Sequence, residues 1–341
     1  MLTPPSTPAL HLALAEGRVD PAMREAAAAL GAEPPTRVAH SLLAWALDRC
    51  GREAAGASWS HALLTVSAAA ALGERLAPER VAPALVGAAG FLAFARPSRA
   101  RREVQPRAWS GVDAWLDALR AGDLPGALAG PPGQSDRARA SLLSAAGWGH
   151  HGILAGHLGR CALRWPDLAD AAWEATVRAW VPMEREELPP GPGRSLEQAA
   201  VAALELLRRA PDLRAVHGVT YAREVLELWG AVDDRAVARL DAFVEQGWER
   251  ARRERRLRGE AATFSLPAVE PTDDARRDAL LDDLLRTEPR PGFGHNLKIA
   301  EAALRLSELL PAHRPRIDAA LAATRPAWTR SRRPWLIWRD R

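Results

Sequence analysis

The stretch GFGHNLKIAEAALRL, residues 292–306, contains in one segment the features that decide the fold. Two glycines form a turn, and the residues after them open an apolar run of helix-favouring residues. The rest of the chain has the same character, since Ala, Leu and Arg dominate, β-branched residues are sparse and Tyr221 is the only tyrosine. This composition favours helices. With 341 residues, of which 48% are hydrophobic, we predict an all-α fold, a single large multi-helix bundle spanning residues 1–341.

Amphipathic helical patterns cover most of the chain, and loops rich in Pro and Gly, such as GPPGQSD and ELPPGPGRS, separate them. No alternating pattern of useful length predicts a strand, and no GxGxxG or P-loop motif follows one. The helices that we predict are 20–31, 37–50, 59–74, 79–95, 109–121, 136–165, 167–180, 195–210, 214–229, 232–257, 273–287, 294–310 and 315–324.

Basic and acidic residues are mostly interspersed, and the formal net charge is +4. This distribution does not predict a nucleic-acid partner. The exception is the C-terminal segment 325–341, RPAWTRSRRPWLIWRDR, in which Arg and Trp alternate. We expect its tryptophans to pack on the body of the protein and its arginines to stay in water. Nucleic-acid binding by this tail is the more remote alternative.

The two cysteines, Cys50 and Cys161, form no CxxC motif and no disulfide framework, which is typical of a reducing compartment. The N-terminal residues lack the charged and apolar regions of a signal peptide. No segment has the long uncharged apolar stretch of a membrane span. We therefore expect a cytoplasmic protein without a membrane partner, and the sequence leaves its oligomeric state open.

One small pattern recurs: a histidine follows a small or apolar residue early in an apolar helix, as in SWSHALLTVSAAAAL and RAVHGVTYAREVLEL. A single such histidine is more often a satisfied core residue than a ligand. Several placed alike predict a converging cluster, and neutral imidazole is the commonest metal ligand in proteins. The histidines in this pattern are His40, His61, the adjacent His150 and His151, His217 and His295.

The local metal signatures HExxH, ExxH and CxxC are absent, so an ion here would take one histidine from each of several helices. His295 is followed at i+3 by Lys298, the only lysine in the chain. Arginine keeps its proton in proteins, whereas a buried lysine can lose it. Lys298 could then act as a neutral amine or, after reaction with CO₂, as a carbamate that offers an oxygen donor. Several histidines with one oxygen donor suit iron or another borderline divalent ion.

Four segments, VAHSLLAWALDRCG, HHGILAGHLGRCALRW, VHGVTYAREVLEL and HNLKIAEAALRL, together resemble the four histidine-bearing motifs of the questin oxidase-like family. The resemblance covers residues of about 37–310 and is most specific in the last two motifs. It implies a helical, non-haem iron oxygenase that acts with O₂ on polycyclic aromatic polyketides or quinones. The implied reaction is oxidative ring opening or a Baeyer–Villiger-like oxygen insertion, with NADPH as a candidate reductant.

Carried over residue by residue, the resemblance implies five metal ligands, with the lysine carboxylated. His150 is the alternative in the second motif. His61 is the alternative in the first, because that motif lacks the Asn that often precedes its histidine. The implied ligands are His40, His151, His217, His295 and Lys298.

Tyr221 and Glu224 lie at i+4 and i+7 from His217 and are the candidate catalytic residues. The alternative for Tyr221 is a core tyrosine bonded to a backbone carbonyl. Glu301, at i+3 from Lys298, could support the ligands or simply be a solvated helix charge. The alternative for the whole protein is a non-catalytic α-helical interaction or ligand-binding module with core histidines. Four tryptophans near the histidines could stack on an aromatic substrate, although core packing is the expected role of most: Trp59, Trp148, Trp165 and Trp229.

Overall fold

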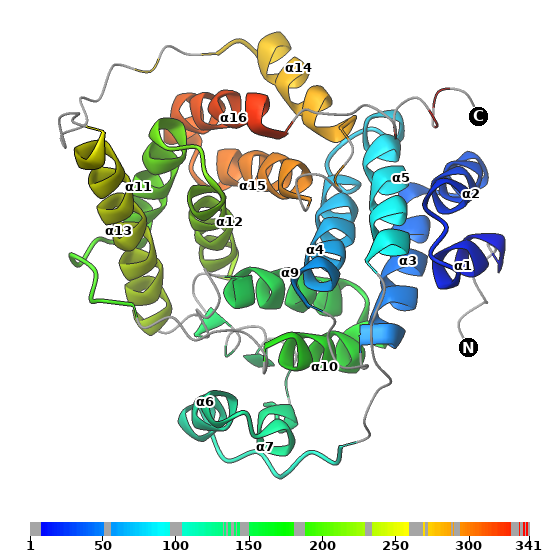
Figure 1. Ribbon diagram of the computed structural model, residues 1–341, viewed down its shortest axis with the longest axis horizontal. Coiled ribbons are helices and arrows are strands. Elements are labelled where there is room, and N and C mark those ends of the chain that lie inside the picture. The colour runs from blue at the N-terminus through cyan, green and yellow to red at the C-terminus, as the bar shows by residue number, and fades with distance from the viewer. Residues whose placement is uncertain are drawn as a thin grey trace.

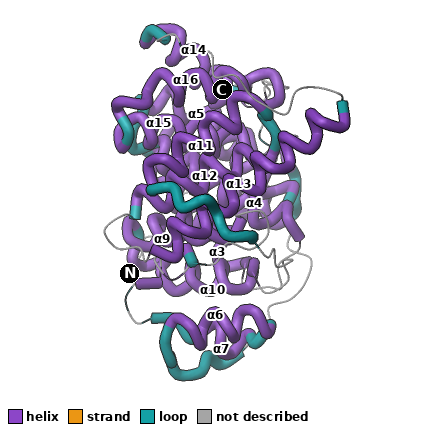
Figure 2. The backbone as a smooth tube through the Cα atoms, turned by 90° about the vertical axis from the view of Figure 1, so that its left-hand side faces the viewer, coloured by secondary structure: helices purple, strands orange, loops and turns teal. Residues whose placement is uncertain are grey.

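A computed structural model of the chain confirms the all-α prediction. It describes residues 8–50, 56–95, 104–131, 133, 136–137, 140, 142–143, 150–180, 188–228, 234–258, 269, 272–287, 289, 294–328, 334, 337 and 339. Within these ranges every regular element is a helix, and loops join the helices (Figure 2). None of the described helices is both long and apolar enough to cross a bilayer.

The helices agree closely with the predicted ones over most of the chain. Their bounds are α1 Pro8–Ala15, α2 Val19–Ala32, α3 Pro35–Cys50, α4 Gly56–Leu72, α5 Pro78–Phe94, α6 Val112–Ala121, α7 Leu124–Leu128, α9 His150–Arg164, α10 Ala169–Trp180, α11 Leu196–Arg209, α12 Leu213–Glu227, α13 Asp234–Leu257, α14 Asp274–Leu285, α15 His295–Leu309 and α16 Arg314–Trp328, with short 3-10 turns at Pro166–Leu168 and Pro311–His313.

Four helices form a closed ring at the centre of the molecule. α4 contacts α9, α9 contacts α12, α12 contacts α15, and α15 contacts α4 again (Figure 1). The other helices lie outside this ring: α3 and α5 pack on α4, α10 packs on α9, and α11 and α13 pack on α12. α6 and α7 lie at one end of the molecule and α14 lies at the other, as both views show (Figures 1 and 2).

The sequences of the ring helices explain why they are central. α12 is buried at every residue from Arg214 to Val225, and α15 at every residue from His295 to Ala303. Helices that are buried on all faces belong inside a bundle, whereas an amphipathic helix such as α11 covers its outside. α12 begins at a side-chain cap, since the Asp212 carboxylate accepts from the Ala215 N–H at 2.8 Å.

Two local differences from the sequence-based expectations are clear. The chain turns at Leu143, and α9 begins at His150 instead of continuing a helix from residue 136. The short helices α1 and α7 were not predicted.

In the C-terminal tail, Pro334 is buried close to Gly87 and Ile337 packs on the core, which agrees with a tail that packs on the body. The tail's own tryptophans lie outside the described residues, apart from the backbone of Trp328.

Candidate metal centre

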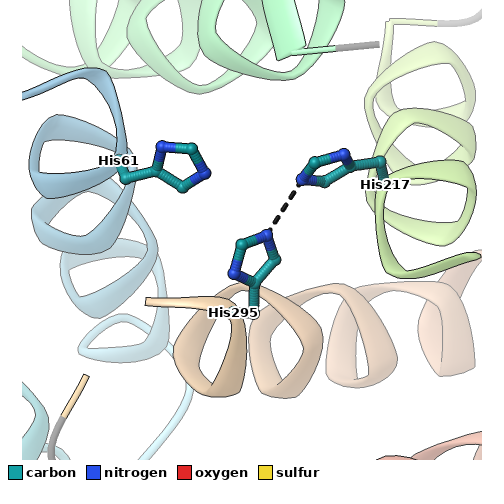
Figure 3. A group of neighbouring side chains, drawn as sticks. All are labelled: His61, His217 and His295. Carbon is teal, nitrogen blue, oxygen red and sulfur yellow. Dashed lines mark hydrogen bonds between the residues drawn. The ribbon is translucent and has the colours of Figure 1, made fainter. Parts of the chain in front are cut away.

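Three histidines from three ring helices meet at the centre of the fold. His61 on α4, His217 on α12 and His295 on α15 are all buried, and each offers a ring nitrogen within 4.8 Å of the others (Figure 3). The Nε2 atoms of His217 and His295 are 2.9 Å apart. The ring of His61 lies 5.3 Å from that of His295 and 6.5 Å from that of His217, between centroids. The three rings therefore face one common point.

Local sequence features place two of these rings. Gly294, which has a left-handed φ of +70°, begins α15 so that His295 is its first residue. The Gly294 backbone lies against Thr65, one turn after His61 on α4. The Thr65 hydroxyl donates to the His61 carbonyl oxygen at 2.6 Å. Gly294 thus brings the start of α15 against α4, one turn from His61.

Lys298 lies one turn along α15 from His295 and is only 1% exposed. Among the residues that the structure describes, its Nζ has no hydrogen-bond partner. Burial lowers the pKa of this amine from its usual 10.5 to about 7. At neutral pH a large fraction of Lys298 is therefore uncharged, which is the form that can coordinate a metal or react with CO₂.

This group of side chains fits a divalent metal ion. Three neutral imidazoles that face one point are the donor set that zinc, iron and copper prefer. Without an ion, the close nitrogens of His217 and His295 require one ring to donate a hydrogen to the other. The buried amine of Lys298, which lacks a partner among the described residues, is costly unless something binds it.

Of the five ligands expected from the sequence, the structure brings His217 and His295 into the cluster, with Lys298 one turn further along α15. His40 lies elsewhere. It is on the outer helix α3, where its Nε2 is 2.9 Å from the Asp167 carboxylate and its ring edge meets Trp165 at 5.3 Å between centroids. Its side chain is 22% exposed. The Asp167 carboxylate thus holds this ring at the surface.

His61, the alternative that the sequence had left open, takes the place expected for His40. The signal was present in the sequence. The segment 56–72 contains no charged residue, whereas the helix of His40 ends in Asp48 and Arg49. A helix without any charged residue is typical of the centre of a bundle. The side chains of His150 and His151 lie outside the described part of the structure, although their backbone begins the ring helix α9.

Tyr221 is a core tyrosine bonded to a backbone carbonyl, which was the alternative to a catalytic role. Its hydroxyl donates to the Leu142 carbonyl oxygen at 2.7 Å, and its ring packs against Gly152 of α9 and meets Phe243 edge-on. Burial raises the pKa of this phenol. The tyrosine therefore keeps its proton and uses it in a core hydrogen bond.

Glu224 and Glu301 belong to a buried charged cluster with Arg160, Arg223 and His157. Arg160 donates to Glu224 at 2.7 and 3.1 Å and to Glu301 at 3.3 Å. Arg223 donates to Glu224 at 2.8 Å and also to Glu301. Two guanidinium groups thus face two carboxylates at the contact of α9, α12 and α15. Glu301 is not the solvated charge that the sequence also allowed, because it is 1% exposed.

His157 connects this charged cluster to α4. Its Nε2 lies 3.3 Å from Glu224, and its Nδ1 lies 3.1 Å from the Ser67 hydroxyl. Burial, then the positive charges of Arg160 and Arg223, and last that of Lys298 when it is protonated, hold the pKa of His157 well below its usual value, so the ring is neutral. Burial raises the pKa of Glu224, against the two arginines that lower it.

The tryptophans divide between core and surface. Trp59 is 1% exposed and packs on Trp45, with 6.3 Å between ring centroids, so it is a core residue. Trp165 is partly buried beside His40. Trp148 and Trp229 lie outside the described residues.

Comparison with known proteins adds nothing to this description: no family model, no curated protein and no solved structure matches the chain.

Proposed function

We propose that this protein is a metal-dependent oxygenase whose ion is held by His61, His217 and His295, with Lys298 as a further ligand. One observation carries the proposal. Three buried imidazoles from three different helices converge on one point, and a buried amine without a described partner lies one turn away. Evolution tolerates such a polar group in a core mainly where it binds something.

The chain's own residues define what the site can do. The imidazoles bind a borderline divalent ion, and iron is our choice because the donors are nitrogen with a single potential oxygen ligand. The neutral Lys298 amine can take up CO₂ to form a carbamate, which adds an anionic oxygen donor. An iron ion held in this way would supply the Lewis-acid and one-electron chemistry through which O₂ attacks an electron-rich aromatic ring. The surrounding apolar helices keep bulk water away from the reacting groups.

The substrate class rests on the sequence motifs. Their resemblance to the questin oxidase-like family supports a polycyclic aromatic or quinone-type substrate, with NADPH as a candidate reductant. Ring opening and Baeyer–Villiger-like oxygen insertion both remain within this proposal. The low cysteine content supports a reducing, cytoplasmic location.

Metal analysis of protein purified without an affinity tag tests the proposal. We expect about one iron per chain in the wild type, as for a three-histidine site with an added ligand. His61→Ala and Lys298→Arg should lose the metal while their helical circular dichroism persists. His40→Ala is the matched control, because His40 lies on the surface beside Asp167, and it should keep full metal content.

Two outcomes would contradict the proposal. If the wild type holds no metal, the helical ligand-binding module becomes the better account. If His40→Ala loses the metal and His61→Ala keeps it, the site is assembled differently. With metal present, consumption of O₂ in the presence of hydroxylated anthraquinones tests the oxygenase activity directly.

A further inference from the structure

The end of α13 carries a surplus of positive charge. Residues 249–260, ERARRERRLRGE, hold six arginines and three glutamates, which leaves three positive charges in excess. Cations in the last turn of a helix complement its dipole, but this effect does not reach beyond that turn. The arginines begin more than a turn earlier, at Arg250, so the helix dipole does not account for the surplus.

Ion pairs along α13 use up the carboxylates of this segment. Arg250 donates to Glu254 at 2.9 Å. Arg252 donates to Glu249 at 2.8 Å and to Glu245, one turn earlier, at 2.9 Å. Both glutamates between residues 249 and 257 are therefore already paired, and the remaining arginines gain no partner from them.

The helix beneath this segment has no spare carboxylate either. Glu205 of α11 pairs with Arg208 at 2.8 Å, with Arg209 at 3.6 Å and with Arg316 of α16 at 3.5 Å. One carboxylate thus serves three cations. Burial, then the charge of Arg208 and last that of Arg255 on α13 lower the pKa of Arg209. Cations of α11 and α13 therefore crowd one another where the two helices end.

Three side chains form an exposed edge at this end of α13. Arg253 and Arg256 are exposed, and neither pairs with a carboxylate among the residues that the structure describes. Leu257 is 81% exposed, more than any other large hydrophobic residue described. Their spacing of i, i+3 and i+4 places all three on one face of the helix. A single exposed leucine is ordinary, but here it projects beside two arginines without partners.

This edge fits the surface of an anionic bilayer. Guanidinium groups bind lipid phosphates, and an apolar side chain beside them enters the boundary between headgroups and acyl chains. Nucleic acid would use the arginines but leave the leucine in water, and single strands favour aromatic side chains, which this edge lacks. A protein partner would need an apolar core larger than one leucine.

We propose that the exposed edge of α13, formed by Arg253, Arg256 and Leu257, docks the protein peripherally on an anionic phospholipid surface. Arginine clusters on an amphipathic helix are a usual means of binding such lipids. The contact needs no helix that spans the bilayer. It departs from the sequence-based expectation of no membrane partner, which rested on spanning segments. The docking is independent of the metal centre.

Sedimentation of the untagged full chain with lipid vesicles tests the docking. Phosphatidylcholine vesicles that contain about 30% phosphatidylserine should bind the wild type at low salt, and pure phosphatidylcholine vesicles should bind it far more weakly. Binding should weaken as the salt concentration rises, because counterions screen the arginines from the surface.

Single substitutions locate the contact. Arg253→Gln and Arg256→Gln should each lower the vesicle partition coefficient about fivefold, the contribution of one arginine near an anionic surface. Leu257→Gln should lower it by about fivefold or more, since the apolar side chain is lost. Arg24→Gln is the matched control, because Arg24 is exposed on α2, on the opposite side of the molecule from α13 (Figure 1). It removes the same charge and should bind like the wild type.

All four substitutions alter exposed side chains, so circular dichroism should show the same helix content in each. Absence of binding to phosphatidylserine vesicles would overturn the proposal. Equal losses in Arg24→Gln and Arg253→Gln would overturn it too, since binding would then follow net charge alone. Vesicle binding that Leu257→Gln leaves unchanged would also contradict it, and tighter binding of a labelled DNA duplex would then assign the arginines to nucleic acid.

Discussion

Gly294 and Thr65 lie so close together that α15 can approach α4 only because residue 294 has no side chain. A Cβ atom at Gly294 would overlap the Thr65 hydroxyl oxygen, which is the atom that donates to the His61 carbonyl. Gly294 also has a φ of +70°, which other residues adopt at a cost. Since His295 is the next residue and His61 lies one turn before Thr65, this contact brings two of the three clustered imidazole rings together.

Gly294→Ala should therefore damage both stability and metal binding. The left-handed backbone alone costs an alanine about 1–3 kcal/mol, and the overlap with Thr65 adds to it. Gly122→Ala is a matched control, because Gly122 also has a φ of +70° but has no atom within 4 Å of the added Cβ. We expect denaturant unfolding to show the larger loss for Gly294→Ala and metal analysis to show loss in that variant alone. Equal losses of stability with full metal content would contradict the role of this contact.

The depressed pKa of Lys298 predicts a pH dependence of stability in the metal-free protein. The unfolded lysine keeps its proton up to its usual pKa of 10.5, while the folded amine releases it near 7. Between these values the unfolded chain binds more protons, so the free energy of unfolding rises with pH, by up to about 1.4 kcal/mol per pH unit. Urea unfolding in the presence of a chelator measures this slope between about pH 7 and about pH 8.5.

Lys298→Met removes the titrating amine and keeps a long apolar side chain, so its slope over that range should be close to zero. The range ends below the usual pKa of the Cys161 thiol, which is 9.0. Burial raises that pKa in the fold, so Cys161 lowers stability only at higher pH. A Lys298→Met protein with the wild-type slope would show that the amine is charged in the fold.

The sequence predicted most helices because their apolar periodicity and Pro/Gly-rich boundaries are local signals. The convergence of His217 and His295 was also predictable, since each lies near the start of a helix whose first turns are mostly apolar. The choice between His40 and His61 depended on which helix occupies the central ring, and packing of α4 against both α9 and α15 decides it. Spacing along one helix could not show that Tyr221 bonds to Leu142 or that Glu224 binds arginines from two helices.

Tyr221→Phe separates a structural role from a catalytic one. The hydroxyl makes one buried hydrogen bond to the Leu142 carbonyl, so its removal should cost about 1 kcal/mol of stability. Metal content and the rate of O₂ consumption at saturating substrate should stay within about twofold of wild type, since the phenol is not available to a substrate. A fall in rate of about a hundredfold or more with normal metal content would restore Tyr221 as a catalytic residue.

Glu224→Gln tests whether the charged cluster stabilises the contact of α9, α12 and α15. Glu224 accepts from Arg160 and Arg223 and is completely buried. A neutral amide in its place would leave two buried guanidinium groups with Glu301 as their one carboxylate in the cluster. Breaking a buried pair in this way costs about 3–5 kcal/mol. The loss should be visible as a lower midpoint of urea unfolding with an unchanged m value.

Glu249→Gln is the control, because Glu249 on α13 is 58% exposed and pairs with Arg252 at the surface. Partly exposed pairs contribute about 0–1 kcal/mol, so this variant should unfold almost like the wild type. If both variants lose equally little, Glu224 is protonated in the fold, since its buried carboxyl already has a raised pKa. The cluster would then carry a net positive charge beside Lys298, which would disfavour a cationic amine there and strengthen the case for its neutral form.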